Sequence, residues 1–168
     1  MTKEIETFID DERWIDARTL ILKKLAIDAK SHWLWTRLSL TYYEQYDYEK
    51  ALEYSTIARK LAPKCPLVLW DYAGALEMLQ RNKLALRTYQ RLIGRGIDST
   101  ALDECGEGIG WARSLIADSH YRAAHCCRKI GRLEDARNHF ENHLALRGPG
   151  CRSIYNLNKV RSEIAKLA

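Results

Sequence analysis

The feature that most constrains the fold of this chain is a repeated spacing of small residues. Ala17, Ala51 and Ala85 are equally spaced along the chain, and Ala136 follows after one and a half of the same interval. A fixed period of about 20–50 residues is typical of chains built from copies of one structural unit. The sequence therefore predicts a repeat protein.

Each unit has the pattern of a helical hairpin. In residues 32–65 the apolar and small positions fall into two sets at helical spacing, and each set forms one stripe along a helix. These positions are Trp35, Leu38, Ser39 and Tyr42 in the first helix and Ala51, Ser55 and Ala58 in the second. We expect Asp47 to cap the second helix, and Pro63 and Pro66 to separate it from the next unit. The small residues Ser39 and Ala51 would let the two helices approach closely.

At these residues the chain resembles the tetratricopeptide repeat (TPR), a helix-turn-helix unit whose period matches the alanine spacing. The matching signature positions are Trp35, Leu38, Ser39, Tyr42, Ala51, Ala58 and Pro63. Ser55 departs from the pattern, where an aromatic residue is usual, and so does His143, where a small residue is usual. The resemblance implies an all-α fold, a right-handed superhelical solenoid of tetratricopeptide-like helical hairpins with a C-terminal capping helix.

The repeats divide the chain into consecutive segments of one domain, 1–168. They are a partial repeat (1–31), two repeats (32–65 and 66–99), an insertion (100–116), a third repeat (117–150) and a capping helix (151–168). Gly106, Gly108 and Gly110 suggest a loop within the insertion, followed by a helix from about Gly108 to Lys129. The capping helix is predicted from an amphipathic series, Ile154, Leu157, Val160, Ile164 and Leu167.

A candidate binding surface follows from the helical geometry. The second, fifth, ninth and twelfth places of each unit point about 140° away from the packing stripe of the first helix, so they would face solvent in an isolated hairpin. The resemblance implies that this face lines a concave groove which binds a peptide or a helix of a partner protein. The candidate groove residues are Trp33, Thr36, Leu40, Tyr43, Leu67, Trp70, Glu77, Tyr121, His125 and Arg128. The alternative is that Trp33 and Trp70 pack on neighbouring repeats or on the N-terminal helix and belong to the core.

The residue types in the groove favour an apolar partner. One branch of the TPR family holds C-terminal carboxylates with basic and amide side chains. The matching places here are Thr36, Leu40, Asp71 and Asp118, with Arg122 as the basic exception. We therefore expect an apolar or aromatic peptide, or an amphipathic helix, as the ligand of an adaptor, scaffold or chaperone-like protein. A homo-oligomer, in which a second copy occupies the groove, is left open.

Charge suggests a second class of partner. The net charge of +5 comes from residues 85–168, which carry 14 basic and 9 acidic side chains. Two basic sets lie at helical spacing: Arg87, Arg91 and Arg95, and Arg122, Arg128, Lys129, Arg132 and Arg137. They offer an alternative function, binding of nucleic acid or of an acidic partner through the arginine-rich C-terminal half. Nucleic acid is the weaker interpretation, because the chain lacks the recognised binding motifs.

Catalysis and metal binding find little support in the sequence. His120, His125, Cys126, Cys127, His139 and His143 lie on two facing helices, but without a CxxC or HExxH pattern. We therefore expect no catalytic residues, no cofactor and no metal. The acidic amino end does not resemble a secretory signal, no apolar run is as long as a membrane span, and the five cysteines show no disulfide pattern. These features predict a cytoplasmic protein without a membrane partner.

Overall fold

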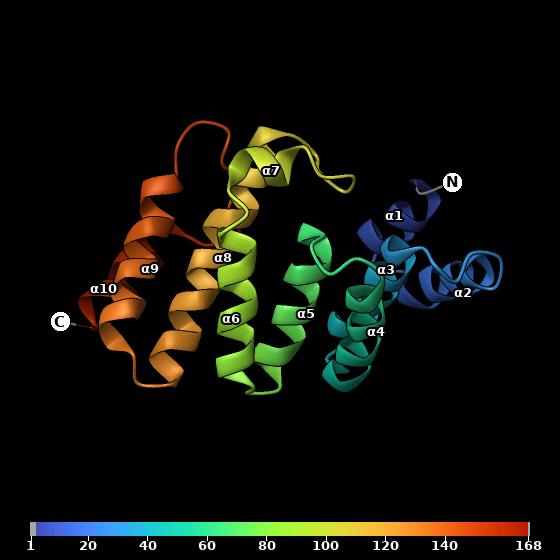
Figure 1. The fold of residues 1–168 in the computed structure, drawn as a ribbon, viewed down its shortest axis with the longest axis horizontal. Helices are drawn as coiled ribbons and strands as arrows, with labels where there is room; N and C mark the ends of the chain where they lie inside the picture. Colours follow the sequence, from blue (N-terminus) through green and yellow to red (C-terminus); the bar gives the residue numbers. More distant parts are fainter. Residues whose placement is uncertain (1–2, 168) are drawn as a thin grey trace. The chain divides into compact units, whose positions relative to one another are not determined.

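The computed structural model describes residues 3–167, and all regular secondary structure within them is helical (Figure 1). The chain divides into two compact units, Met1–Leu79 and Gln80–Ala168. The first unit contains α1 (Lys3–Asp10), α2 (Trp14–Leu25), α3 (His32–Tyr43), α4 (Tyr48–Leu61) and α5 (Pro66–Met78). The second contains α6 (Asn82–Ile93), α7 (Ile97–Ala101), α8 (Ile109–Lys129), α9 (Leu133–Leu146) and α10 (Leu157–Ala165).

The hairpin of α3 and α4 forms as the small residues predict. The hydroxyl of Ser39 donates a hydrogen bond of 2.8 Å to the carbonyl oxygen of Ala51, and both residues are buried. A carboxylate oxygen of Asp47 accepts a hydrogen bond from the backbone N–H of Lys50 at 3.2 Å, which confirms the predicted N-cap of α4. The two helices therefore approach closely, at a hydrogen bond between a side chain and the backbone.

The first unit has a continuous apolar core. Helix α3 packs against α2 and α4, and α5 packs against α4 and α3. Ile5 of α1, Ile21 of α2 and Leu38 of α3 are fully buried in one cluster. Pro66 opens α5 shortly after α4 ends at its C-cap, Ala62, as the prolines predict. This stacking places α1 and α3 as the first helices of successive hairpins.

The second unit is built on the long helix α8. It packs against α6 on one side and α9 on the other, and its range, Ile109–Lys129, confirms the predicted long helix. The loop before it folds tightly, because a Cβ atom at Gly106 would lie 2.5 Å from the carbonyl oxygen of Ala101. Only glycine fits at that position.

Helix α10 packs against α9, near the C-terminal end of the chain. Val160 is fully buried in a cluster with Tyr121 and Phe140. The predicted start of this helix was wrong: Ile154 precedes α10 and is 76% exposed. The helix begins only after Asn156, which is its N-cap. The Asn156 side chain accepts hydrogen bonds from two backbone N–H groups of the first turn.

Within residues 3–167, no helix combines the length and the apolar character that crossing a membrane requires.

Candidate partner-binding site

The candidate residues on α3 differ in their solvent exposure. Leu40 and Tyr43 are half-buried, and the Tyr43 ring lies 5.3 Å from that of Tyr48. Thr36 is fully buried, and its hydroxyl donates to the carbonyl oxygen of Trp33 at 2.7 Å. The expectation that Thr36 faces solvent was wrong, because it considered an isolated hairpin without the helices that pack around α3.

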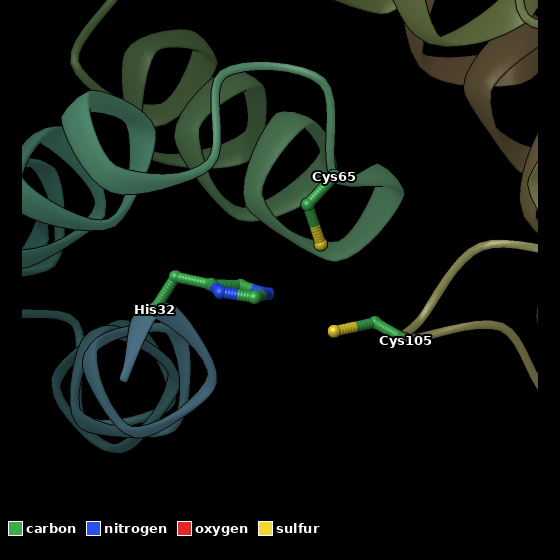
Figure 2. Close-up of side chains that lie close together, drawn as sticks. All are labelled: His32, Cys65 and Cys105. Carbon is green, nitrogen blue, oxygen red and sulfur yellow. The ribbon is translucent and has the colours of Figure 1, made fainter. Parts of the chain in front are cut away.

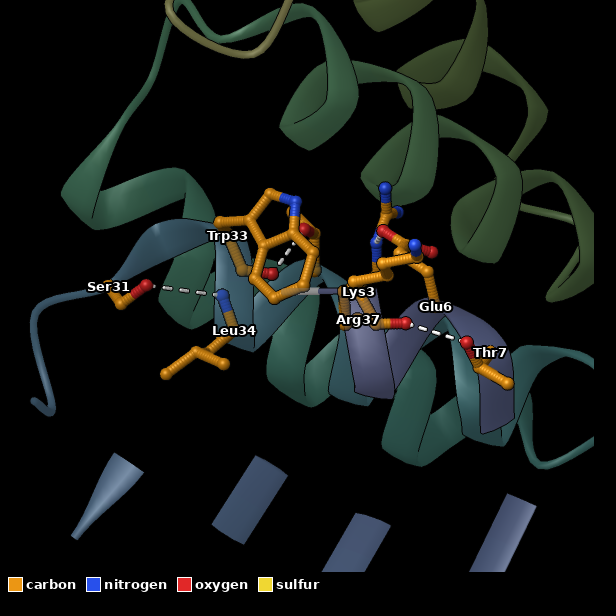
Figure 3. A network of polar contacts seen from close by, with 8 residues as sticks. Lys3, Glu6, Thr7, Ser31, Trp33, Leu34 and Arg37 are labelled. Atoms are coloured by element: carbon orange, nitrogen blue, oxygen red, sulfur yellow. Dashed lines mark hydrogen bonds and ion pairs between the residues drawn. The ribbon is translucent and has the colours of Figure 1, made fainter. Parts of the chain in front are cut away.

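Trp33 lies under the guanidinium of Arg37, which is paired with Glu6 of the N-terminal helix (Figure 3). The guanidinium of Arg37 lies 5.2 Å from the centre of the Trp33 ring, and its Nε donates to a carboxylate oxygen of Glu6 on α1 at 2.8 Å. Trp33 also packs against the core cluster that contains Ile5 of α1. Packing on the N-terminal helix therefore accounts for part of the Trp33 surface, and the rest stays exposed.

Helix α5 contributes three candidates to the same unit. Leu67, Trp70 and Glu77 are half-buried, whereas Gly74 between them is buried. Asp71, beside Trp70, has a covered carboxylate oxygen, Oδ2, with no hydrogen-bond partner. Burial raises the pKa of Asp71 to about 7, while the charge of Arg37 opposes this rise. Residue spacing alone did not identify Asp71 as a distinctive part of this surface.

Other segments of the chain cover the candidate residues on α8. Tyr121 is 4% exposed and stacks on Tyr155, with ring centres 3.7 Å apart. His125 lies edge-on to Phe140, with ring centres 5.3 Å apart. Arg128 forms an ion pair with Glu163 of α10. The segment that ends in α10 thus covers the face of α8 that the sequence pattern marked as a groove.

The histidines of the second unit serve its packing. Nδ1 of His120 and Nδ1 of His139 lie 2.9 Å apart, so the N–H of one imidazole donates a hydrogen bond to the other. Nδ1 of His143 donates to the carbonyl oxygen of Ala117 at 2.7 Å. Burial lowers the pKa of His120 to about 4 and lowers those of His139 and His143. These side chains are therefore neutral at pH 7.

His32 and Cys65 are a pair of possible metal ligands in the first unit (Figure 2). His32 begins α3 and Cys65 directly precedes α5, and one nitrogen of the imidazole lies within 4.8 Å of the thiol sulfur. The sequence analysis missed this pair, although the two residues stand nearly one repeat period apart, at equivalent helix starts. Structural zinc takes four ligands, so two ligands do not define a metal site.

Several arginines of the second unit pair with acids of the same unit. Arg132 contacts Asp135 at 2.6 Å, and Arg95 contacts Asp103 at 2.8 Å. Together with the ion pair of Arg128, these contacts neutralise part of the positive charge that the sequence places in this half.

Comparison with solved structures shows which fold this is. MamA is 16% identical, with a TM-score of 0.74 over 97% of this chain and 81% of that one. The N-terminal domain of stress-induced protein-1 from C. elegans is 20% identical, with a TM-score of 0.61 over 82% of this chain and 94% of that one. YrrB, described as a TPR protein with an unusual peptide-binding site, is 14% identical, with a TM-score of 0.51 over 96% of this chain and 88% of its own.

No protein-family model and no curated protein sequence matches this chain. At identities of 14–20% the structural likeness establishes the fold. The chain has the tetratricopeptide-repeat fold, as the signature residues of the hairpins predict.

Proposed function

We propose that this protein is a non-enzymatic interaction module, an adaptor, scaffold or chaperone-like protein, that holds a peptide or an amphipathic helix of a partner protein. The binding surface in this proposal is formed by the exposed parts of α3 and α5 in the first unit. It is named here the α3–α5 surface, and its residues are Trp33, Leu40, Tyr43, Leu67, Trp70, Asp71 and Glu77.

The observation that carries the proposal is the character of the side chains left at this surface. Leu40, Tyr43, Leu67 and Trp70 are apolar or aromatic, and each remains partly exposed. Apolar patches of this kind mark contact sites on protein surfaces, and tryptophan and tyrosine contribute strongly to binding energy there. Such a surface suits the apolar face of a helix or the alternate side chains of an extended peptide.

The second unit is a weaker candidate for the same role. Tyr121 and Arg128 occupy equivalent repeat positions, but Tyr155 and Glu163 of the chain's own C-terminal segment lie against them. A partner would have to displace that segment to reach them. The proposal is therefore restricted to the first unit.

An affinity capture from a lysate of the source organism tests the proposal. The native protein is compared with a Leu40→Gln, Leu67→Gln double variant, which removes apolar surface without adding charge. The matched control is Leu22→Gln, because Leu22 lies on α2 and is 50% exposed. We expect a protein retained by the native chain and by the control but released by the double variant. Equal retention by all three chains would remove the α3–α5 surface as the binding site.

We also propose a cytoplasmic location. Cys127 is a buried free thiol, and Cys151 is a half-buried one. Free thiols are typical of proteins in a reducing compartment. Microscopy of the chain carrying a fluorescent tag in its source organism would check this, and an extracellular signal would contradict it.

A further inference from the structure

The α3–α5 surface contains a carboxyl group that its own unit leaves unsatisfied. Oδ2 of Asp71 is covered and has no hydrogen-bond partner, although the residue as a whole keeps some exposure. Native proteins nearly always pair buried carboxylate oxygens with donors, because the loss of hydration is unfavourable otherwise. An unsatisfied acid at a proposed binding surface therefore indicates where a donor from outside would be accepted.

The nearest cation does not satisfy this acid. Arg37 on α3 is one repeat before Asp71 in the sequence, and its charge lowers the pKa of Asp71. Its guanidinium, however, is already engaged by Glu6 at 2.8 Å and lies over the Trp33 ring (Figure 3). Glu6 thus neutralises part of the charge of Arg37, and the covered Oδ2 of Asp71 receives no hydrogen bond.

The other charged groups near Asp71 do not neutralise it. Glu44, at the end of α3, raises the pKa of Asp71 further through its negative charge. On α4, which packs against α5, the guanidinium of Arg59 lies 4.5 Å from the centre of the Tyr72 ring. Arg59 is not among the charges that shift the pKa of Asp71, so within the described residues the cation that acts on this carboxyl is Arg37, which is paired with Glu6.

We propose that the partner segment bound at the α3–α5 surface carries a lysine or arginine flanked by apolar side chains, and that this cation pairs with Asp71. The inference rests on the proposed function and specifies the chemistry of the partner. Leu40, Leu67 and Trp70 contact the apolar side chains, while Asp71 supplies the one charge-assisted hydrogen bond. Charge complementarity selects this occupant over an apolar or acidic segment.

Pairing with a cation also changes the protonation of Asp71. Burial raises its pKa to about 7, so part of the population carries a proton on this carboxyl at neutral pH. A bound cation favours the carboxylate and displaces that proton. Binding at pH 7 therefore releases protons, which calorimetry in buffers of different ionisation enthalpy detects.

A selection from phage-displayed random peptides tests the inference on the full chain. The native protein is compared with Asp71→Asn, which keeps the size of the side chain and removes its charge. Asp71→Glu keeps the charge, and Asp28→Asn is the matched control, because Asp28 is an exposed aspartate in the turn between α2 and α3. Circular dichroism and urea midpoints establish that each variant is folded.

We expect the native protein to enrich peptides with lysine or arginine between apolar residues. Synthetic copies of these peptides should bind Asp71→Asn at least tenfold more weakly, and Asp71→Glu and Asp28→Asn nearly as well as the native chain. Enriched peptides that lack a basic residue, or that bind Asp71→Asn equally well, would overturn the inference. If those peptides still lose affinity for the Leu40→Gln, Leu67→Gln variant, the proposed function stands without it.

Two further outcomes concern the surface itself. Failure to enrich any peptide on the native protein would argue against the proposed function and against this inference together. A native dimer in light scattering that Leu67→Gln converts to a monomer would make a second copy the occupant and would also overturn the inference.

Discussion

The contact between Ser39 and Ala51 makes a sharp prediction for the variant Ala51→Leu. Ala51 is completely buried, and its carbonyl oxygen accepts the hydroxyl of Ser39 at 2.8 Å. The larger side chain must enter the interface between α3 and α4, where these two residues hold the helices together. The hairpin can accept it only by separating the helices or by bending side chains away from their preferred rotamers.

The size of the effect follows from two contributions. Overpacking a closely packed interface lowers the free energy of unfolding by about 1–3 kcal/mol. Separation of the helices also breaks the Ser39 hydrogen bond, which is worth about 1 kcal/mol. The expected loss is therefore about 2–4 kcal/mol, a large share of the roughly 5–15 kcal/mol that stabilises a typical domain.

Tryptophan fluorescence during urea denaturation measures this loss in the unit concerned. Trp14, Trp33, Trp35 and Trp70 belong to the first unit, and only Trp111 of the five tryptophans belongs to the second. For a denaturant slope of about 1.5 kcal/mol per molar urea, the midpoint should fall by about 1–3 M.

A second leucine variant on the same helix separates packing from helix propensity. Glu53 is exposed on α4, so Glu53→Leu should change the free energy of unfolding by less than about 0.5 kcal/mol. If Ala51→Leu unfolds at the same urea concentration as Glu53→Leu, the close approach of α3 and α4 does not require a small residue. The explanation of the repeated alanines would then be wrong.

Three further predictions address buried groups. Asp71→Asn should stabilise the first unit at pH 8 by on the order of 2–4 kcal/mol. The reason is the raised pKa of about 7, because of which the native chain loses stability as the pH rises from about 4 through 7. Urea midpoints of both chains at pH 5 and 8 check this, and equal midpoints at pH 8 would refute it. The second unit should lose stability as the pH falls from about 6.5 towards 4, because burial depresses the pKa of His120 to about 4 and lowers that of His139, so the unfolded chain binds more protons in that range. Melting curves at pH 7 and 5 should show a loss of about 1–2 kcal/mol that His120→Gln reduces, and an unchanged pH dependence in that variant would contradict the assignment. Phe140→Ala should destabilise the second unit by about 3–5 kcal/mol, because Phe140 is fully buried. The control Leu102→Ala should have little effect in the same denaturation assay, because Leu102 is 86% exposed.

The sequence alone was sufficient for the features that depend on local chemistry and on the repeat period. Ala17, Ala51 and Ala85 disclosed the repeat, and Asp47 marked the start of α4 because an aspartate cap acts on a backbone N–H within the first turn of the helix. The length of α8 followed from the glycines before it and the continuous helical pattern after them. Such features require no knowledge of distant parts of the chain.

Whether each candidate binding residue is buried or exposed was decided by the tertiary structure. Thr36 and Tyr121 occupy groove positions by spacing, yet both are buried, because segments distant in the sequence lie against them. Tyr155 covers Tyr121 from the segment that follows α9, and no helical period predicts that contact.

The tertiary structure also decides which charged residues pair, as Asp71 shows. Arg37 stands one repeat before Asp71 in the sequence, but in the folded chain Arg37 pairs with Glu6. A helix period determines which residues share a face. Which of them reach solvent, and which charges find partners, depends on packing and on competition between neighbours that only the folded chain brings together.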